Sequence, residues 1–285
     1  MEKKKWNNFW KVTIKCLLSG AALFVVFHSI DRQKFMAVFL RANPAWLLLA
    51  LLLYNVSKVL SSFRLNYYFS DTGSHLPERD NLLLYYVGMF YNLFLPGGIG
   101  GDGFKVYLLH RDTNAPLKSL LQAVLFDRLS GMVALGVLSL LFGWMAFPEI
   151  PYHPFALMAS MLCFPLWYLM NRLFASRFQK SFWYTSLLSL SVQGIQILSA
   201  WSILTSLGIF DYTSAYLTVF LASSLVSVLP ISIGGIGIRE LVFIAAAGFC
   251  AIAQDEAVAF SFLFFLITAV SSLPGGFLTA PSFKK

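Results

Sequence analysis

Charged residues are scarce in this chain. Asp, Glu, Lys and Arg together supply 12% of its 285 residues, whereas 58% of the residues are hydrophobic. A typical water-soluble domain has about twice that charged fraction. Mean hydropathy is also clearly positive, at +0.71. The composition therefore predicts an integral membrane protein.

Cysteine and histidine are also rare, with three Cys and four His in the whole chain. The cysteines lie in or beside apolar runs, are odd in number and lack metal-ligand spacing. The histidines lie near the ends of these runs and never cluster. We therefore expect packing cysteines, no disulfide framework, no metal site and no cofactor.

Long apolar runs dominate what is present. A membrane-spanning helix needs about 20 mostly apolar residues. Eight runs approach that length, at residues 12–30, 44–66, 80–95, 119–147, 154–171, 184–207, 213–229 and 256–280. No segment between them is long enough for a separate soluble domain. The sequence predicts one all-α polytopic membrane domain over residues 1–285, whose first helix is not a cleaved signal peptide.

A glycine-rich phrase occurs twice in the chain. Residues 95–105 read LPGGIGGDGFK, and residues 229–239, which begin 134 positions later, read LPISIGGIGIR. Six of the eleven positions are identical, and the last exchanges one cation for another. The same shift superimposes three predicted spans of the first half on spans of the second. The pattern predicts a duplicated architecture, with halves at about 12–147 and 154–280.

The distribution of cations indicates how the halves are oriented. With a cytoplasmic N-terminus, nine loop cations fall outside the cell if the glycine-rich phrases do not cross the membrane, but only three do if they cross. Cytoplasmic loops are enriched in Lys and Arg. We therefore expect inverted repeats in the cell membrane with both termini cytoplasmic. Re-entry of the phrases stays open, because residues 103–110 are too few to cross unless the preceding span ends in mid-membrane.

The repeated phrases are candidates for a binding site. Proline and glycine interrupt helices, and a broken backbone at membrane depth persists only where protein or a water-filled cavity covers it. Paired discontinuous helices in inverted repeats indicate a transport site near the midplane, where helix N-termini attract an anion such as phosphate. The candidate ligands are Lys105 and Arg239 with the backbone amides of Gly100, Gly101, Gly234 and Gly235.

Other ionisable residues lie inside apolar runs. Asp127 and Arg128 fall within the span at 119–147. A charge at a helix centre costs about 3 kcal/mol and persists when it is paired or faces a cavity. We expect Arg128 to join Lys105 and Arg239 in holding a phosphate. Acidic partners would neutralise these cations or couple to protons, namely Asp102, Asp127 and Glu240, with Asp102 facing either Arg128 or Arg239.

Plainer interpretations compete with this hypothesis. The glycines could serve close helix packing or a re-entrant turn, and the long side chains of Arg128 and Lys58 could extend to the membrane interface. Residues 98–103 also match the letters of the dinucleotide fingerprint G-x-G-x-x-G. That fingerprint requires a preceding strand in a soluble αβ unit, so it is rejected here.

The phrases also resemble a known family. Residues 92–102 (NLFLPGGIGGD), the following Lys105, the pair Asp127-Arg128, and residues 229–240 (LPISIGGIGIRE) are similar to the membrane domain of the lysylphosphatidylglycerol synthetase family, also called flippase-like. The resemblance covers nearly the whole chain. In full-length members a soluble domain transfers lysine to phosphatidylglycerol and the membrane part flips the product. This chain shows no such soluble domain.

The resemblance implies a protein that binds and translocates an anionic phospholipid or a polyprenyl-linked glycolipid. Three alternatives stay open: the membrane part of a phosphatidylglycerol lysyltransferase, a membrane-embedded glycosyl transfer step, and a subunit that works with a separately encoded soluble transferase. We expect no enzymatic activity from this chain alone and no nucleic-acid partner. The net charge of +8 is better explained by loops near anionic lipid heads. The oligomeric state is not predicted.

Overall fold

The computed structural model describes residues 32–94, 100–151, 153–228, 237–250 and 252–278, with the single residues 24, 28, 281 and 283. In chain order its elements are α2 (Arg32–Leu40), α3 (Pro44–Asp71), α4 (Glu78–Phe94), α5 (Gly100–Thr113), α6 (Leu117–Ala146), α7 (His153–Phe174), η1 (Ser176–Gln179), α8 (Phe182–Ser206), α9 (Thr213–Val228), α10 (Ile238–Ala247), α11 (Gln254–Ser272) and α12 (Pro274–Phe277). Over these ranges the protein is helical and has no strand. The all-α prediction is confirmed.

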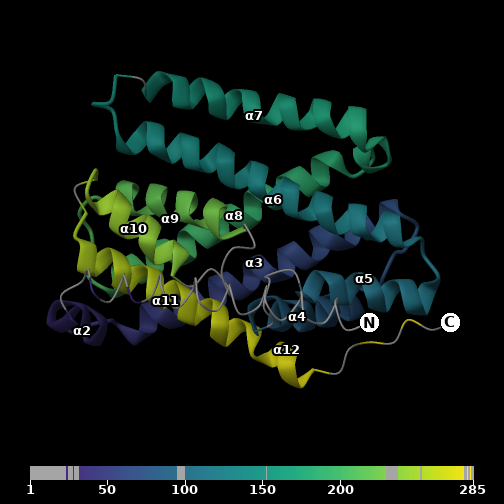
Figure 1. The fold of residues 1–285 in the computed structure, drawn as a ribbon, viewed down its shortest axis with the longest axis horizontal. Helices are drawn as coiled ribbons and strands as arrows, with labels where there is room; N and C mark the ends of the chain where they lie inside the picture. Colours follow the sequence, from purple (N-terminus) through teal and green to yellow (C-terminus); the bar gives the residue numbers. More distant parts are fainter. Residues whose placement is uncertain are drawn as a thin grey trace, which may run out of the picture.

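Five helical segments are long and apolar enough to cross a membrane. They are Pro44–Asp71, Leu117–Ala146, His153–Phe174, Phe182–Ser206 and Gln254–Phe277. In Figure 1 they run roughly along the long axis of the molecule. Their length and composition support the prediction of a multi-pass membrane protein.

The other three predicted spans have a different outcome. The runs at 80–95 and 213–229 correspond to the shorter helices α4 and α9, of 17 and 16 residues. The run at 12–30 lies outside the described residues, apart from residues 24 and 28. Within the described residues, five helices and not eight are long enough to cross a membrane.

Helices α3 and α8 form the antiparallel centre of the fold. The backbone N–H of Asn43, before α3, donates to the carbonyl of Ser206 at the end of α8, at 2.9 Å. At the other end, the Ser181 hydroxyl before α8 donates to Asp71 at 3.0 Å. These contacts define two ends of the molecule, here called the Asn43 end and the Asp71 end.

Helices α4 and α5 form a hairpin that enters from the Asp71 end. Glu78, at the start of α4, accepts a hydrogen bond from Asn66 of α3. Helix α5 then returns toward the start of α6, where Ser119 bonds to Arg177 near the Asp71 end. Close packing depends on two glycines, because a Cβ added at Gly101 would lie 1.8 Å from the carbonyl oxygen of Gly88.

Helices α9 and α10 form a second hairpin, which enters from the Asn43 end. Tyr216, in the first turn of α9, bonds to Glu256 in the first turn of α11. Glu256 also pairs with Arg41, two residues before Asn43. A short connection leads from the end of α10 to the start of α11. Figure 1 shows the two hairpins in opposite halves of the molecule, with α9 and α10 on the left and α4 and α5 on the right.

The helix contacts follow the sequence repeat. A shift of 134 residues carries α3 to α8, α4 to α9, α5 to α10 and α6 to α11. Contacts within the first set of helices have counterparts in the second. The α4–α5 contact corresponds to α9–α10, and α5–α6 corresponds to α10–α11. Likewise α6–α9 corresponds to α11–α4, and α6–α7 corresponds to α11–α2. Helices that correspond under the sequence shift therefore make corresponding contacts.

Helices α4 and α5 lie antiparallel, so α5 runs back toward the end at which α4 begins. This arrangement fits both the expected crossing of the first glycine-rich phrase and its re-entry, so the crossing stays a prediction. Cation counts could not distinguish the two cases, because a hairpin and a pair of crossings leave the following loop on the same side. Residues 95–99 and 229–236 themselves lie outside the described residues.

The C-terminal helices join the two hairpins. Pro274 ends α11 at Ser272 and begins α12, since proline cannot continue the hydrogen-bonding ladder. Helix α11 packs on α10, and α12 packs on α4. The latter contact is close, because a Cβ added at Gly275 would lie 2.0 Å from the carbonyl oxygen of Tyr86. Helix α7, by contrast, forms the outer layer in Figure 1 and packs mainly on α6.

Opposite entry of the hairpins predicts their labelling pattern. In a chain whose native cysteines are replaced, we expect Arg79→Cys and Lys118→Cys, at the two outer ends of the first hairpin, to react with an impermeant maleimide from the same side of the membrane. Phe210→Cys, before the second hairpin, should react from the other side. Labelling of Arg79→Cys and Lys118→Cys from opposite sides would contradict the hairpin.

The close approach of α4 and α5 predicts a sensitive glycine. Gly101→Ala should force the two helices apart at a cost of about 1–3 kcal/mol, measured as a lower thermal midpoint in detergent. Gly103→Ala is the matched control, because a Cβ at Gly103 meets nothing within 4 Å and Ala favours a helix. Equal midpoints for the two variants would refute this packing.

Candidate functional site

A polar layer separates two apolar clusters along the length of the molecule. One cluster surrounds α9, α10 and α11 toward the Asn43 end, and the other surrounds α4, α5 and the start of α6 toward the Asp71 end. On α3, Tyr54 belongs to the first cluster and Leu65 to the second. Between them lie Ser57, Lys58, Ser61 and Arg64. Polar residues therefore gather in the middle of a membrane-spanning helix.

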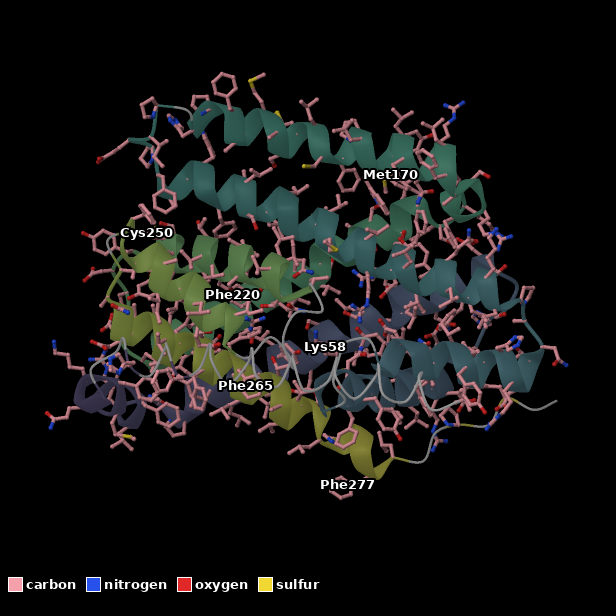
Figure 2. All side chains as sticks on the ribbon, viewed as in Figure 1. Lys58, Met170, Phe220, Cys250, Phe265 and Phe277 are labelled. Atoms are coloured by element: carbon pink, nitrogen blue, oxygen red, sulfur yellow. The ribbon has the colours of Figure 1, made fainter. Side chains whose placement is uncertain are left out.

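A cavity of about 320 Å³ lies in this layer. The side chains around it that can be charged or can donate hydrogen bonds come from α3, α4, α5, α6, α8, α9 and α11. They are Tyr54, Lys58, Arg64, Tyr85, Asn92, Asp102, Lys105, Asp127, Arg128, Gln193, Ser227, Thr268 and Ser272. Figure 2 shows Lys58 near the middle of the molecule. The cavity thus lies far from both ends.

Asp102 holds two cations together beside the tip of the first hairpin. Its carboxylate accepts from Lys105 Nζ at 3.1 Å and from Arg128 Nε on α6. The amide of Asn92, on α4, adds a hydrogen bond at 3.3 Å. The Asn92 side chain also accepts the backbone N–H of Gly101 at 2.8 Å. Asn92 therefore satisfies a helix-start amide and the central carboxylate at once.

A second ion pair lies deeper, between α3 and α6. Arg64 Nε lies 2.7 Å from Asp127 Oδ1. The same guanidinium donates to Ser189 of α8 at 3.0 Å. Both side chains of the pair are almost fully buried. Because a buried charge needs a partner of opposite sign, each residue of this pair depends on the other.

The two lysines of the cavity lie over aromatic rings. Lys58 Nζ is 4.4 Å from the centre of the Tyr54 ring, and Lys105 Nζ is 4.4 Å from the centre of the Tyr85 ring. A ring face attracts an ammonium group through its quadrupole. The rings hold the lysines in place without supplying negative charge.

The charges around the cavity do not balance. The lining contains four cations, Lys58, Arg64, Lys105 and Arg128, and two carboxylates, Asp102 and Asp127. The Arg128 side chain keeps 27% of its surface exposed, compared with 7% for Arg64 and 5% for Lys105. The site is therefore cationic, and Arg128 is the ion-paired cation most open to a ligand.

The structure brings together four of the residues singled out from sequence. Lys105, Arg128, Asp102 and Asp127 all line the cavity. Of the two expected partners of Asp102, the structure selects Arg128. Asp127 does not pair with its neighbour Arg128, because adjacent residues of a helix point about 100° apart.

Arg239 and Glu240 lie elsewhere. The Arg239 guanidinium lies 4.8 Å from the centre of the Phe264 ring and 5.8 Å from that of Phe220, and it is not in the described lining. Glu240 accepts the backbone N–H of Gly237 and the hydroxyl of Ser261, each at 2.7 Å. Its carboxylate therefore caps the start of α10, and among the described residues it makes no ion pair with Arg239.

The expected glycine amides have mixed outcomes. Gly100 and Gly101 begin α5, as a phosphate site at a helix start would require. The N–H of Gly101, however, already donates to Asn92, so it is not available to a ligand in this conformation. Gly234 and Gly235 lie outside the described residues.

Sequence reasoning missed part of the site. Arg64 lies two residues before the predicted end of the span at 66, where a cation is ordinary, but α3 continues to Asp71. Lys58 was assigned to the interface as an alternative, yet it lies mid-helix and lines the cavity. An amide such as Asn92 gives no signal by itself. The spacing of Lys58 and Arg64 on one apolar run was the available clue.

Residues 12–275 match the family model described as "Lysylphosphatidylglycerol synthase TM region". The chain belongs to this family. The resemblance drawn from the glycine-rich phrases is thereby confirmed. No curated protein matches the sequence.

Family membership supports an integral membrane protein with a lipid-related function. The name of the family refers to the membrane region of a synthase and identifies no site residues. The family match therefore says nothing about the role of the cationic cavity.

The shared carboxylate predicts a strong stability effect. Asp102→Asn should leave Lys105 and Arg128 without a counter-charge, at a cost of about 3–5 kcal/mol, the usual result of breaking a buried pair. The measurement is thermal unfolding in detergent. Adding Arg128→Gln to Asp102→Asn should recover part of the loss.

Asp211→Asn is the control, because Asp211 is exposed in the turn between α8 and α9. A loss in Asp102→Asn no greater than in Asp211→Asn would contradict the proposed coupling.

Proposed function

We propose that this protein binds a lipid with an anionic headgroup, a phospholipid or a polyprenyl-linked glycolipid, and moves it across the bilayer. One observation carries the proposal: a cavity with excess positive charge lies midway along membrane-spanning helices. Ionisable residues at this depth are expensive and usually mark a substrate path. The family match supports a lipid as the substrate.

The proposed topology is an inverted repeat in the cell membrane. The antiparallel arrangement of α3 and α8 and the hairpins that enter from opposite ends support it. Cations support a cytoplasmic Asp71 end, since loop and helix-end Lys and Arg are more numerous there than at the Asn43 end. They are Arg79, Arg111, Lys118, Arg172, Arg177 and Lys180, against Arg32, Lys34 and Arg41. Under this proposal both termini are cytoplasmic.

The ion pairs suggest how a headgroup is received. A phosphate that enters the cavity meets Arg128 first and shares the donors that Asp102 now occupies. The apolar clusters on either side then act as the two barriers to the headgroup. Alternating access would require these barriers to open in turn around a fixed site. The acyl chains remain in lipid throughout.

The family description favours one other candidate. The chain could be the membrane part of a phosphatidylglycerol lysyltransferase that works with a separately encoded soluble transferase. Co-purification of such a partner, with lysylated lipid in the same cells, would favour it. An embedded transfer step needs a free base, whereas Asp102 and Asp127 both hold cations. We therefore propose transport as the primary function.

Reconstitution tests the proposal. In liposomes with fluorescent phosphatidylglycerol in both leaflets, the protein should increase the fraction of label that an external reductant can reach. The combined change Arg128→Gln with Lys58→Gln should reduce this rate at least tenfold, because each lost charge removes roughly 1.5–3 kcal/mol of hydrogen bonding to the headgroup.

Lys118→Gln is the control, because Lys118 is exposed at the start of α6 and outside the cavity. It should retain the wild-type rate. Identical rates in all three proteins, each shown to be folded, would remove the cavity from the mechanism.

A further inference from the structure

We infer that the cavity selects headgroups whose terminal phosphorus group carries two negative charges. This describes a lipid phosphomonoester or diphosphate, in preference to a phosphodiester such as phosphatidylglycerol. The inference rests on the proposed function and specifies the substrate class of the same site. It also disfavours the lysylated lipid that the family description mentions.

The positive charges left uncompensated determine this choice. Arg64 and Asp127 neutralise each other, and Arg64 is further fixed by Ser189. Asp102 is shared by Lys105 and Arg128, so that group retains one positive charge. Lys58 lies over a neutral ring and, within the described lining, has no carboxylate at ion-pair distance. Two positive charges therefore remain for a ligand.

Within the described ranges, the charged residues at the start of α10 do not change the count, because Arg239 and Glu240 add one charge of each sign. Residues 95–99 and 229–236, which connect the helices of each hairpin, contain no ionisable side chain. The excess of two is thus a property of the hairpins and the four long helices that surround the cavity.

Membrane depth turns this excess into selectivity. An uncompensated charge at the centre of a bilayer is strongly disfavoured. A dianion cancels both charges, whereas a phosphodiester leaves one. Lysylphosphatidylglycerol carries one phosphate charge and two amino groups, so it would add to the excess. Both carboxylates that could bind those amino groups already bond to cations of the chain.

The arrangement of donors agrees with a compact group that has several acceptor oxygens. Lys58 approaches from α3, Lys105 from α5 and Arg128 from α6. The three side chains thus converge from three different elements. A terminal phosphate offers three oxygens to such donors, whereas a diester uses two of its four oxygens in ester bonds. The remaining lining is neutral and includes Gln193, Thr268 and Ser272.

Binding to the full chain in neutral phosphatidylcholine nanodiscs tests the inference. Phosphatidic acid, phosphatidylglycerol and lysylphosphatidylglycerol with identical acyl chains provide a dianion, a monoanion and a cation. We expect phosphatidic acid to bind about tenfold more tightly than phosphatidylglycerol, as one further charged hydrogen bond implies. Lysylphosphatidylglycerol should bind most weakly.

The pH dependence gives a second readout. A phosphomonoester gains its second charge near pH 6, so its affinity should increase as pH rises through that value, whereas phosphatidylglycerol keeps one charge. Lys58→Gln should reduce the preference for phosphatidic acid about tenfold. Lys118→Gln, outside the cavity, should leave the preference unchanged.

Each outcome decides a different statement. Equal binding of phosphatidic acid and phosphatidylglycerol would overturn the dianion preference but leave the proposed function standing. Binding of neither would overturn both. Inorganic phosphate is the free-ion arm: if it displaces phosphatidic acid at equal concentration, the site recognises a soluble anion, and the lipid assignment fails. Weak competition by inorganic phosphate supports a lipid ligand.

Discussion

A helix that ends inside a bilayer leaves backbone groups that lipid cannot satisfy, and this constraint organises the centre of the fold. Helix α5 begins at depth, and the Asn92 side chain accepts its Gly101 N–H. Helix α10 begins in the same way, and the Glu240 carboxylate accepts the N–H of Gly237. Two different side chains therefore solve one problem in the two halves. Only the first solution requires the partner helix to lie very close, because Asn92 belongs to α4 whereas Glu240 belongs to α10 itself.

The first solution leads directly to the charged cavity. Asn92 also donates to Asp102, and Asp102 holds Lys105 and Arg128. The charged residues of the second hairpin form no such group. Glu240 caps the start of α10, and Arg239 lies over the rings of Phe264 and Phe220. The two hairpins thus use their charged residues differently. The charged residues in the described lining of the cavity all precede residue 147.

Some of this was accessible from sequence, because composition and repetition do not depend on three-dimensional detail. The helical class, the duplicated helices and the grouping of Asp102, Lys105 and Arg128 followed from apolar runs and the repeated phrase. The choice between re-entry and a double crossing at the first hairpin did not follow from sequence, since both give the same loop charges. Arg64 was missed because its role depends on Asp127, 63 positions away. The ring partners of Arg239 likewise come from α9 and α11, and no local pattern predicts them.

The joint at Pro274 has a mechanical consequence. Helix α11 packs on the second hairpin through α10, and its continuation α12 is seated against Tyr86 of the first hairpin. Helix α6 makes the equivalent link without a break, from α5 to α9. Two helical connections therefore link the hairpins, one continuous and one interrupted at Pro274. Any relative movement of the hairpins would have to displace both connections, and the proline is the point at which the second can bend.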